Sequence, residues 1–202
     1  MTTRSPDLHG NAPDHSSIVL LLIDVINDLE FEGGDRLLTH ALPAAKKIAA
    51  LKQRTALLGI PAIYVNDNFG KWRSDFKKLI SHCLDDGVRG KALAELLRPG
   101  SEDYFVLKPK NSGFFSTSLE ILLKHLGAET LILTGLTADS CILFTAGDAH
   151  MRDYHLWIPG DCVASQDANE NTRALEFMKR VLEADIRPST ESDLIGSDPR
   201  AS

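Results

Sequence analysis

Three residues whose types complement one another in catalysis, Asp24, Lys108 and Cys141, each follow an apolar run of this chain of 202 residues. Cys141 opens a helical pattern, and a thiol in the first turn of a helix lies where the helix dipole and backbone N–H groups favour negative charge. A thiol that acts as a nucleophile needs a base and a charge partner. A carboxylate and an ammonium group suit those two roles.

Each of these residues also has an ordinary structural explanation. An aspartate at a strand end is commonly a turn residue, a lysine there is commonly solvated, and a cysteine in an apolar helix commonly packs in the core. Together, however, they form a consistent set. Asp24 can take the thiol proton, Lys108 can stabilise both negative charges, and Cys141 can attack a carbonyl carbon. The combination predicts nucleophilic catalysis.

Strand-like and helix-like segments alternate along the chain, which predicts an α/β domain with a parallel sheet. The apolar runs typical of buried strands are 17–23, 61–65, 104–107, 130–134 and 155–158, and 185–187 is the expected short sixth strand. Helical spacing is seen over 36–58, 74–83, 91–97, 118–126, 141–152 and 168–182. Right-handed crossovers place the strand carboxyl ends on one edge, so the three residues above are expected to meet there.

Composition restricts the class of protein. A chain that is 43% hydrophobic and 25% charged is typical of one soluble domain, and at this length it buries roughly 70% of its unfolded surface without needing a metal ion. The net charge of -6 argues against nucleic acid as a partner, and no apolar run reaches the roughly 20 residues of a membrane span. We expect a polar N-terminal arm (1–17) without signal-peptide character, a domain (18–188) and a polar C-terminal tail (189–202).

The cysteines and histidines show no metal or disulfide spacing. Cys83, Cys141 and Cys162 are odd in number and widely separated, so the expected compartment is a reducing cytoplasm. Cys83 follows His82 directly, but neighbours in sequence do not face each other on a helix, and we interpret Cys83 as a packing residue.

Three motifs occur in order: Leu-Ile-Asp-Val-Ile-Asn-Asp at 22–28, Val-Leu-Lys-Pro-Lys-Asn-Ser-Gly-Phe at 106–114 and Gly-Leu-Thr-Ala-Asp-Ser-Cys at 135–141. With the segments 144–149 and 161–165 that follow the cysteine, they resemble the isochorismatase-like cysteine hydrolase family over roughly 17–186. The resemblance implies a Rossmann-like, three-layer αβα sandwich with a six-stranded parallel sheet. It also implies a homodimer or homotetramer.

The same resemblance implies a catalytic triad of Asp24, Lys108 and Cys141. A cis peptide bond between Leu136 and Thr137 is implied as well, and it would aim the N–H groups of Thr137 and Cys141 at the substrate oxygen as an oxyanion hole. The implied reaction is hydrolysis of a C–N bond through a thioester on the cysteine.

Two departures from the family pattern affect the expected pocket. Ile26 and Leu29 stand where many members have a glutamine and an aromatic residue, so the pocket near Asp24 is expected to be apolar. Nicotinamidases of the family bind a metal through an Asp-x-His pattern, and the segment 66–72 has no histidine.

No metal or other cofactor is therefore expected. Asn66, Asp67 and Asn68 carry oxygen atoms that could bind an ion, but a loop of turn-forming side chains is the preferred interpretation. True isochorismatases of the family lack the cysteine, so its presence favours an acyl-type reaction over cleavage of a vinyl ether.

The sequence thus predicts a metal-independent cysteine hydrolase acting on a small amide, ureido or carbamoyl compound. The alternatives are a thiol-dependent ester or lactone hydrolase, and a catalytically silent binding protein on the same fold. Phe69, Trp72 and Phe114 are candidate substrate contacts, with core or interface packing as their other explanation. The expected partners are a small-molecule substrate and further copies of the chain, with no nucleic acid and no membrane.

Overall fold

A computed structural model describes residues 15–69 and 75–191, and its centre is a parallel sheet. The strands are β1 (Ile18–Ile23), β2 (Ala62–Asp67), β3 (Tyr104–Lys108), β4 (Thr130–Leu136), β5 (His155–Trp157) and β6 (Val163–Ala164). The first five lie in the order β3-β2-β1-β4-β5, and β6 pairs with the end of β4. The predicted six-stranded parallel sheet is confirmed.

The position predicted for the sixth strand was wrong. Asp185 forms a single parallel bridge with Trp157 and the pairing stops there. The N–H of Arg187 donates to the Asp185 carboxylate at 2.9 Å, so the chain turns on itself instead of continuing along β5. The sixth strand is β6, whose two residues are too few to give a periodic pattern.

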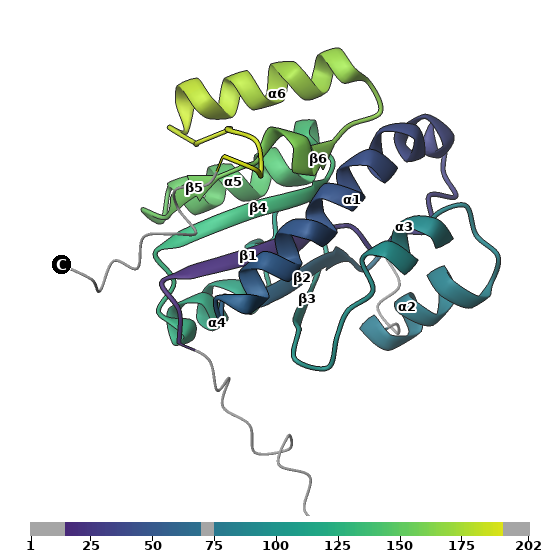
Figure 1. Ribbon diagram of the computed structural model, residues 1–202, viewed down its shortest axis with the longest axis horizontal. Coiled ribbons are helices and arrows are strands. Elements are labelled where there is room, and N and C mark those ends of the chain that lie inside the picture. Colours follow the sequence, from purple (N-terminus) through teal and green to yellow (C-terminus); the bar gives the residue numbers. More distant parts are fainter. Residues whose placement is uncertain (1–14, 70–74, 192–202) are drawn as a thin grey trace, which may run out of the picture.

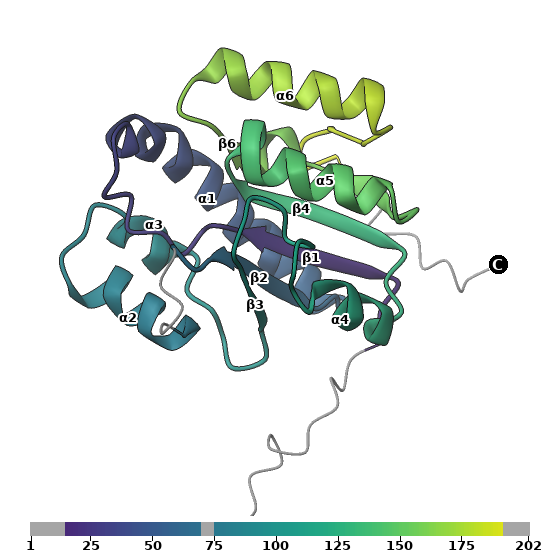
Figure 2. The same ribbon diagram turned by 180° about the vertical axis from the view of Figure 1, so that it is seen from behind.

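Helices cover both faces of the sheet, as Figures 1 and 2 show from opposite sides. One face carries α1 (Gly34–Leu57), α2 (Phe76–Asp85) and α3 (Lys91–Leu96), and the other carries α4 (Leu119–Leu126), α5 (Leu143–His150) and α6 (Ala168–Val181). Alternate residues of β1 divide between the two cores: Leu20 and Leu22 pack against α1, while Leu21 and Ile23 pack against the opposite layer. The three layers follow from strands that are apolar on both faces.

A glycine lets the ends of β1 and β4 approach each other closely. Gly135 pairs with Ile23 and has φ +115, and a Cβ at this position would lie 2.1 Å from the Ile23 carbonyl oxygen. Only glycine fits both the backbone angle and the contact. The close approach places the residues after β4 next to Asp24, which directly follows β1.

Candidate active site

The three residues predicted to carry the chemistry meet at the carboxyl edge of the sheet. Asp24 follows β1, Lys108 is the last residue of β3, and Cys141 lies in η2 (Ala138–Ile142), just past β4. The Lys108 Nζ lies 2.9 Å from the Asp24 Oδ2 and 3.3 Å from the Cys141 Sγ. Lys108 is completely buried and Asp24 is 5% exposed, so the ammonium group interacts with both acidic groups away from solvent.

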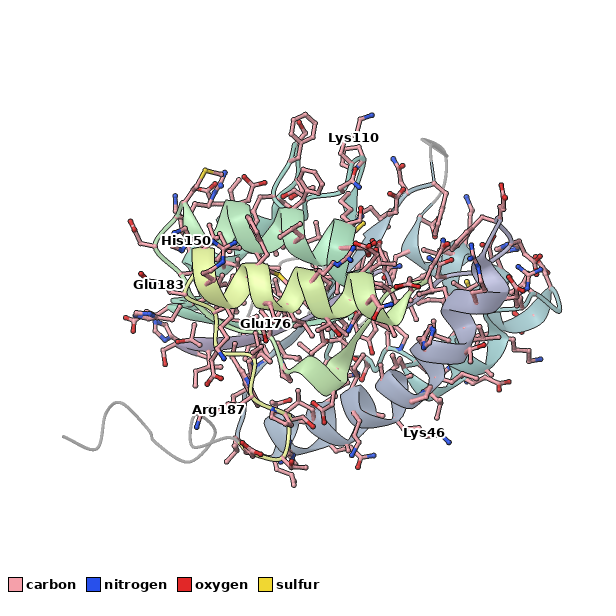
Figure 3. The ribbon with its side chains drawn as sticks, turned by 90° about the horizontal axis from the view of Figure 1, so that it is seen from above. Lys46, Lys110, His150, Glu176, Glu183 and Arg187 are labelled. Atoms are coloured by element: carbon pink, nitrogen blue, oxygen red, sulfur yellow. The ribbon has the colours of Figure 1, made fainter. Side chains whose placement is uncertain are left out.

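Further contacts hold the lysine and the aspartate in place. The Lys108 ammonium also donates to the Lys110 carbonyl at 3.2 Å and lies 3.6 Å from the Asp67 Oδ2. The Asp67 N–H donates to the Asp24 Oδ1 at 2.7 Å, so each oxygen of Asp24 has its own partner. The side chain of Lys110 itself extends outward from the molecule in Figure 3, and only its carbonyl serves the site.

Burial and charge set the protonation of this cluster. Burial raises the pKa of Asp24 above its ordinary value, although the Lys108 ammonium opposes the rise. Burial and the nearby Asp24 carboxylate raise the pKa of the Cys141 thiol to about 12. Burial alone would lower the pKa of Lys108, but the charges of Asp24 and Cys141 outweigh it and raise that pKa. The resting site therefore holds a thiol, not the thiolate that the helix position favours.

The backbone around the cysteine differs from the predicted helix start. Residues Ala138–Ile142 form a turn of π-helix, and α5 begins only after it. The N–H groups of Ser140 and Ile142 both donate to the Thr137 carbonyl at 3.1 Å, and the Leu136–Thr137 peptide bond is cis. Single turns of π-helix occur often at functional sites.

A cavity of about 210 Å³ lies beside Asp67, between the loops after β1 and β2 and helix α2. Its lining combines charged and apolar side chains: Asp28, Asp67, Asn68, Phe69, Asp75, Lys78, Leu79, His82 and Leu107. Sequence reasoning missed Asp28, Lys78 and His82, because helical spacing shows that α2 has a polar face but not that this face lines a cavity beside Asp67.

Ile26 and Leu29, from which an apolar pocket near Asp24 is predicted, do not line this cavity. Both side chains are fully buried in the core on the α1 side of the sheet, and neither lines the cavity. Although they replace polar or aromatic residues of the family pattern, both side chains point into the core, so the cavity is lined by other residues.

The three candidate substrate contacts have different outcomes. Phe69 lines the cavity, whereas Trp72 lies outside the described residues. Phe114 is 6% exposed and packs beside Tyr154, with the Arg152 guanidinium 4.8 Å from its ring centroid. Tyr154 directly precedes β5, at the amino edge of the sheet, so the ring of Phe114 points away from the triad.

Side chains at the end of β2 hydrogen-bond to nearby backbone groups. The Asn66 side chain donates to the Ile26 carbonyl at 2.8 Å, and Asp67 accepts from the Phe69 N–H at 2.6 Å. Across 15–69 and 75–191, no group of three or more His, Cys, Asp or Glu residues could hold a metal ion. The three cysteines are free thiols.

Residues 18–186 match the family model described as the isochorismatase domain. The chain belongs to the isochorismatase family. It is 39% identical over 176 residues to the uncharacterized isochorismatase family protein YaaI of Bacillus subtilis, a match that covers 87% of this chain and 95% of YaaI. The isochorismatase-family hydrolase assignment thus rests on nearly the whole domain.

Amidohydrolases are among the relatives of this isochorismatase-family chain. The crystal structure of N-carbamoylsarcosine amidase from Thermoplasma acidophilum has a TM-score of 0.65 and 28% identity, covering 88% of this chain and 99% of that one. Ureidoacrylate amidohydrolase RutB of Methylorubrum extorquens is 35% identical over 71 residues, which is 35% of this chain and 29% of RutB. In the part of the chain that the structure describes, no helix is long and apolar enough to cross a membrane.

Proposed function

We propose that this isochorismatase-family hydrolase cleaves the C–N bond of a small amide, ureido or carbamoyl compound through a thioester on Cys141, without a metal ion. The observation that carries the proposal is the buried ammonium of Lys108, in contact with both the Asp24 carboxylate and the Cys141 sulfur. The named substrates of N-carbamoylsarcosine amidase and ureidoacrylate amidohydrolase support the substrate class.

The first step forms the thioester. Asp24 takes the thiol proton while the Cys141 sulfur attacks the carbonyl carbon, and a C–S bond forms. The N–H groups of Thr137 and Cys141 stabilise the negative oxygen of the tetrahedral intermediate. Asp24 then gives its proton to the nitrogen, the C–N bond breaks, and ammonia or an amine leaves.

The second step releases the acid. Asp24 takes a proton from water as the water oxygen attacks the thioester carbon, and the C–S bond breaks. The departing sulfur regains its proton from Asp24. Lys108 stays protonated throughout, which keeps a positive charge beside whichever of the two acidic groups is negative.

The raised pKa values of Asp24 and Cys141 suit this sequence of proton transfers. A carboxylate with a raised pKa is a stronger base, and a thiol with a pKa of about 12 loses its proton only as the sulfur attacks. A single proton can then move between the two groups without leaving the site.

A screen for ammonia release over small amides, ureides and carbamoyl compounds tests the proposal. We expect the Cys141→Ala variant to lose the activity of any hit by roughly 10³-fold or more, because the nucleophile is gone. The matched control is Cys83→Ala, since Cys83 is buried in α2 and should leave turnover unchanged.

Activity that persists in Cys141→Ala would refute covalent catalysis by this residue. Hydrolysis restricted to esters and lactones would replace the proposed amidase with the thiol-dependent esterase. If the protein turned over no amide, ureide, ester or lactone, a binding role on the same fold would be favoured.

A further inference from the structure

Among the contacts that hold the turn carrying Cys141 is a buried hydroxyl on the segment after β6. Ser165 directly follows β6 and is 1% exposed. Its Oγ donates to the Asp139 Oδ1 at 2.7 Å and accepts from the Asp139 N–H at 3.4 Å. Both the carboxylate and the backbone N–H of Asp139 are therefore held by the same side chain, two positions before the nucleophile.

The pairing of β6 with β4 explains why Ser165 reaches this turn. Val163 and Ala164 pair with Gly135 and Leu136, so the next residue along β6 lies beside the first residues after β4. The short strand therefore places the Ser165 hydroxyl beside the segment that follows Leu136.

The hydrogen bonds of the turn separate its N–H groups into two sets. The N–H groups of Ser140 and Ile142 bind the Thr137 carbonyl, and that of Asp139 binds Ser165. The N–H groups of Thr137 and Cys141, which the proposed reaction uses, lie on the same short segment. Their direction therefore depends on how firmly the intervening residues are held.

Because Asp139 is negatively charged, the direction of its carboxylate affects the stability of the oxyanion. A carboxylate free to swing within this turn could approach the oxygen that becomes negative during acyl transfer, and the two negative charges would repel each other. The Ser165 hydroxyl donates to this carboxylate and fixes its direction.

We infer that Asp139 and Ser165 are positioning residues that hold the turn in the geometry needed to stabilise the oxyanion. The inference rests on the proposed acyl transfer to Cys141. The pair does not participate in the contacts among Asp24, Lys108 and the sulfur.

Two reactions of the same thiol distinguish this role from general stabilisation of the fold. Acylation by p-nitrophenyl acetate passes through an oxyanion, and release of p-nitrophenolate measures it. Alkylation by iodoacetamide displaces iodide from a saturated carbon and forms no oxyanion. Neither reaction requires the natural substrate to be known.

We expect Ser165→Ala and Asp139→Ala each to slow acylation by roughly tenfold or more, and to change alkylation by less than about twofold. Asp139→Asn keeps an oxygen that accepts the Ser165 hydrogen bond, so it should acylate at about the wild-type rate. The double alanine variant should be no slower than either single variant, because the two residues act as a unit.

The matched control is Ser189→Ala. Ser189 is 3% exposed and its hydroxyl donates to the Asp161 carboxylate at 2.8 Å, so this variant breaks a buried serine–aspartate bond outside the turn. Its acylation rate should match the wild type. Asp139 is exposed, so Asp139→Ala remains informative even if Ser165→Ala does not fold.

Three results would overturn the inference: acylation by Asp139→Ala within about twofold of wild type, an equal loss of alkylation, or no Cys141-dependent acylation in the wild type. Failure of the amidase proposal is a separate result. In that case no amide or ureide is hydrolysed, while acylation by the ester still depends on Ser165.

Discussion

At Cys141, two effects act on the thiol in opposite directions. A position at the start of a helix favours the thiolate by no more than about 2 kcal/mol. Burial and the Asp24 carboxylate raise its pKa from 9.0 to about 12, which corresponds to about 4 kcal/mol. The second effect is larger, so the cysteine rests as a thiol, and in acyl transfer Asp24 must take its proton as the sulfur attacks.

Substitution of Asp24 separates the two roles of its carboxylate. Asp24→Asn should reduce turnover of an acyl substrate by roughly 10²–10⁴-fold, because the base is lost. It should at the same time accelerate alkylation of Cys141, because the carboxylate that raises the pKa of the thiol is gone while the Lys108 ammonium remains. Mass spectrometry of iodoacetamide labelling between about pH 6 and about pH 10 measures the second effect.

The wild-type labelling rate should rise through this whole pH range, since a thiol with a pKa of about 12 does not become fully ionised within it. Labelling of the buried Cys83 in the same spectra reports any loss of structure. A wild-type rate that levels off near neutral pH would contradict the resting thiol, as would slower labelling in Asp24→Asn.

At the scale of elements, the periodic spacing of apolar residues predicts the long strands and helices. It does not predict single turns or very short strands. The long apolar runs predict β1 to β5, and the order of the chain then brings Asp24, Lys108 and Cys141 to one edge. The π-helical turn at Ala138–Ile142 and the two-residue β6 have no periodic signal, because each is set by pairing with distant segments. The Asp139–Ser165 pair could not be predicted for the same reason.

Helix α2, which forms one wall of the cavity, is fastened to the loop after β1 by a histidine. The His82 Nδ1 lies 2.7 Å from the Asp86 Oδ2, and its Nε2 lies 3.2 Å from the Asp28 Oδ2. A neutral imidazole has one N–H, so only the protonated ring donates to both carboxylates. The hydrogen bonds that His82 donates to Asp86 and then to Asp28 raise the pKa of His82 above its ordinary value.

The stability that His82 adds should therefore depend on pH. Because the pKa is raised on folding, the stabilisation is complete below the ordinary histidine value of 6.5 and is lost as the pH rises through the folded value. We expect wild type to melt about 2 °C above His82→Gln near pH 6, and the difference to disappear toward pH 9. Thermal unfolding of both proteins across this range measures it.

Asp86→Asn provides the matched control, since it removes one of the two carboxylates and should weaken the pH dependence without abolishing it. If the wild type and His82→Gln differed by the same amount at every pH, the histidine would stabilise α2 by packing alone.

At the scale of the whole molecule, the site lies where the direction of the sheet order changes. The chain adds β2 and β3 on one side of β1 and then crosses to place β4 on the other side, so the loops after β1 and β4 diverge. Parallel sheets bind ligands at this kind of position. The alternation of strands and helices predicts that the site lies at the carboxyl edge of the sheet. Apolar spacing does not predict whether a loop side chain points into the site or into the core. Phe114 and Ile26 belong to the motifs at 106–114 and 22–28, yet both side chains pack in the core.

The segment 185–189 closes the sheet edge after α6, and Figure 3 shows Arg187 on this segment. The Asp185 N–H donates to the Leu156 carbonyl at 2.9 Å, the Trp157 indole N–H donates to the Arg187 carbonyl at 3.1 Å, and the Ser189 N–H donates to the Asp161 carboxylate at 2.7 Å. Ser189, assigned to the polar tail from the sequence, is thus buried against the domain.

A chain that ends after Ala184 should lose about 3 kcal/mol or more of unfolding free energy, because several partly buried hydrogen bonds are removed and their partners are left unsatisfied. Trp157 is 1% exposed, so its fluorescence should shift to the red in the same variant. A chain that ends after Glu191 keeps all of these bonds and should match the full-length protein in urea unfolding. Equal stability of the two truncated chains would show that the segment adds nothing to the sheet edge, and that the hydrophobic layers alone hold β5 in place.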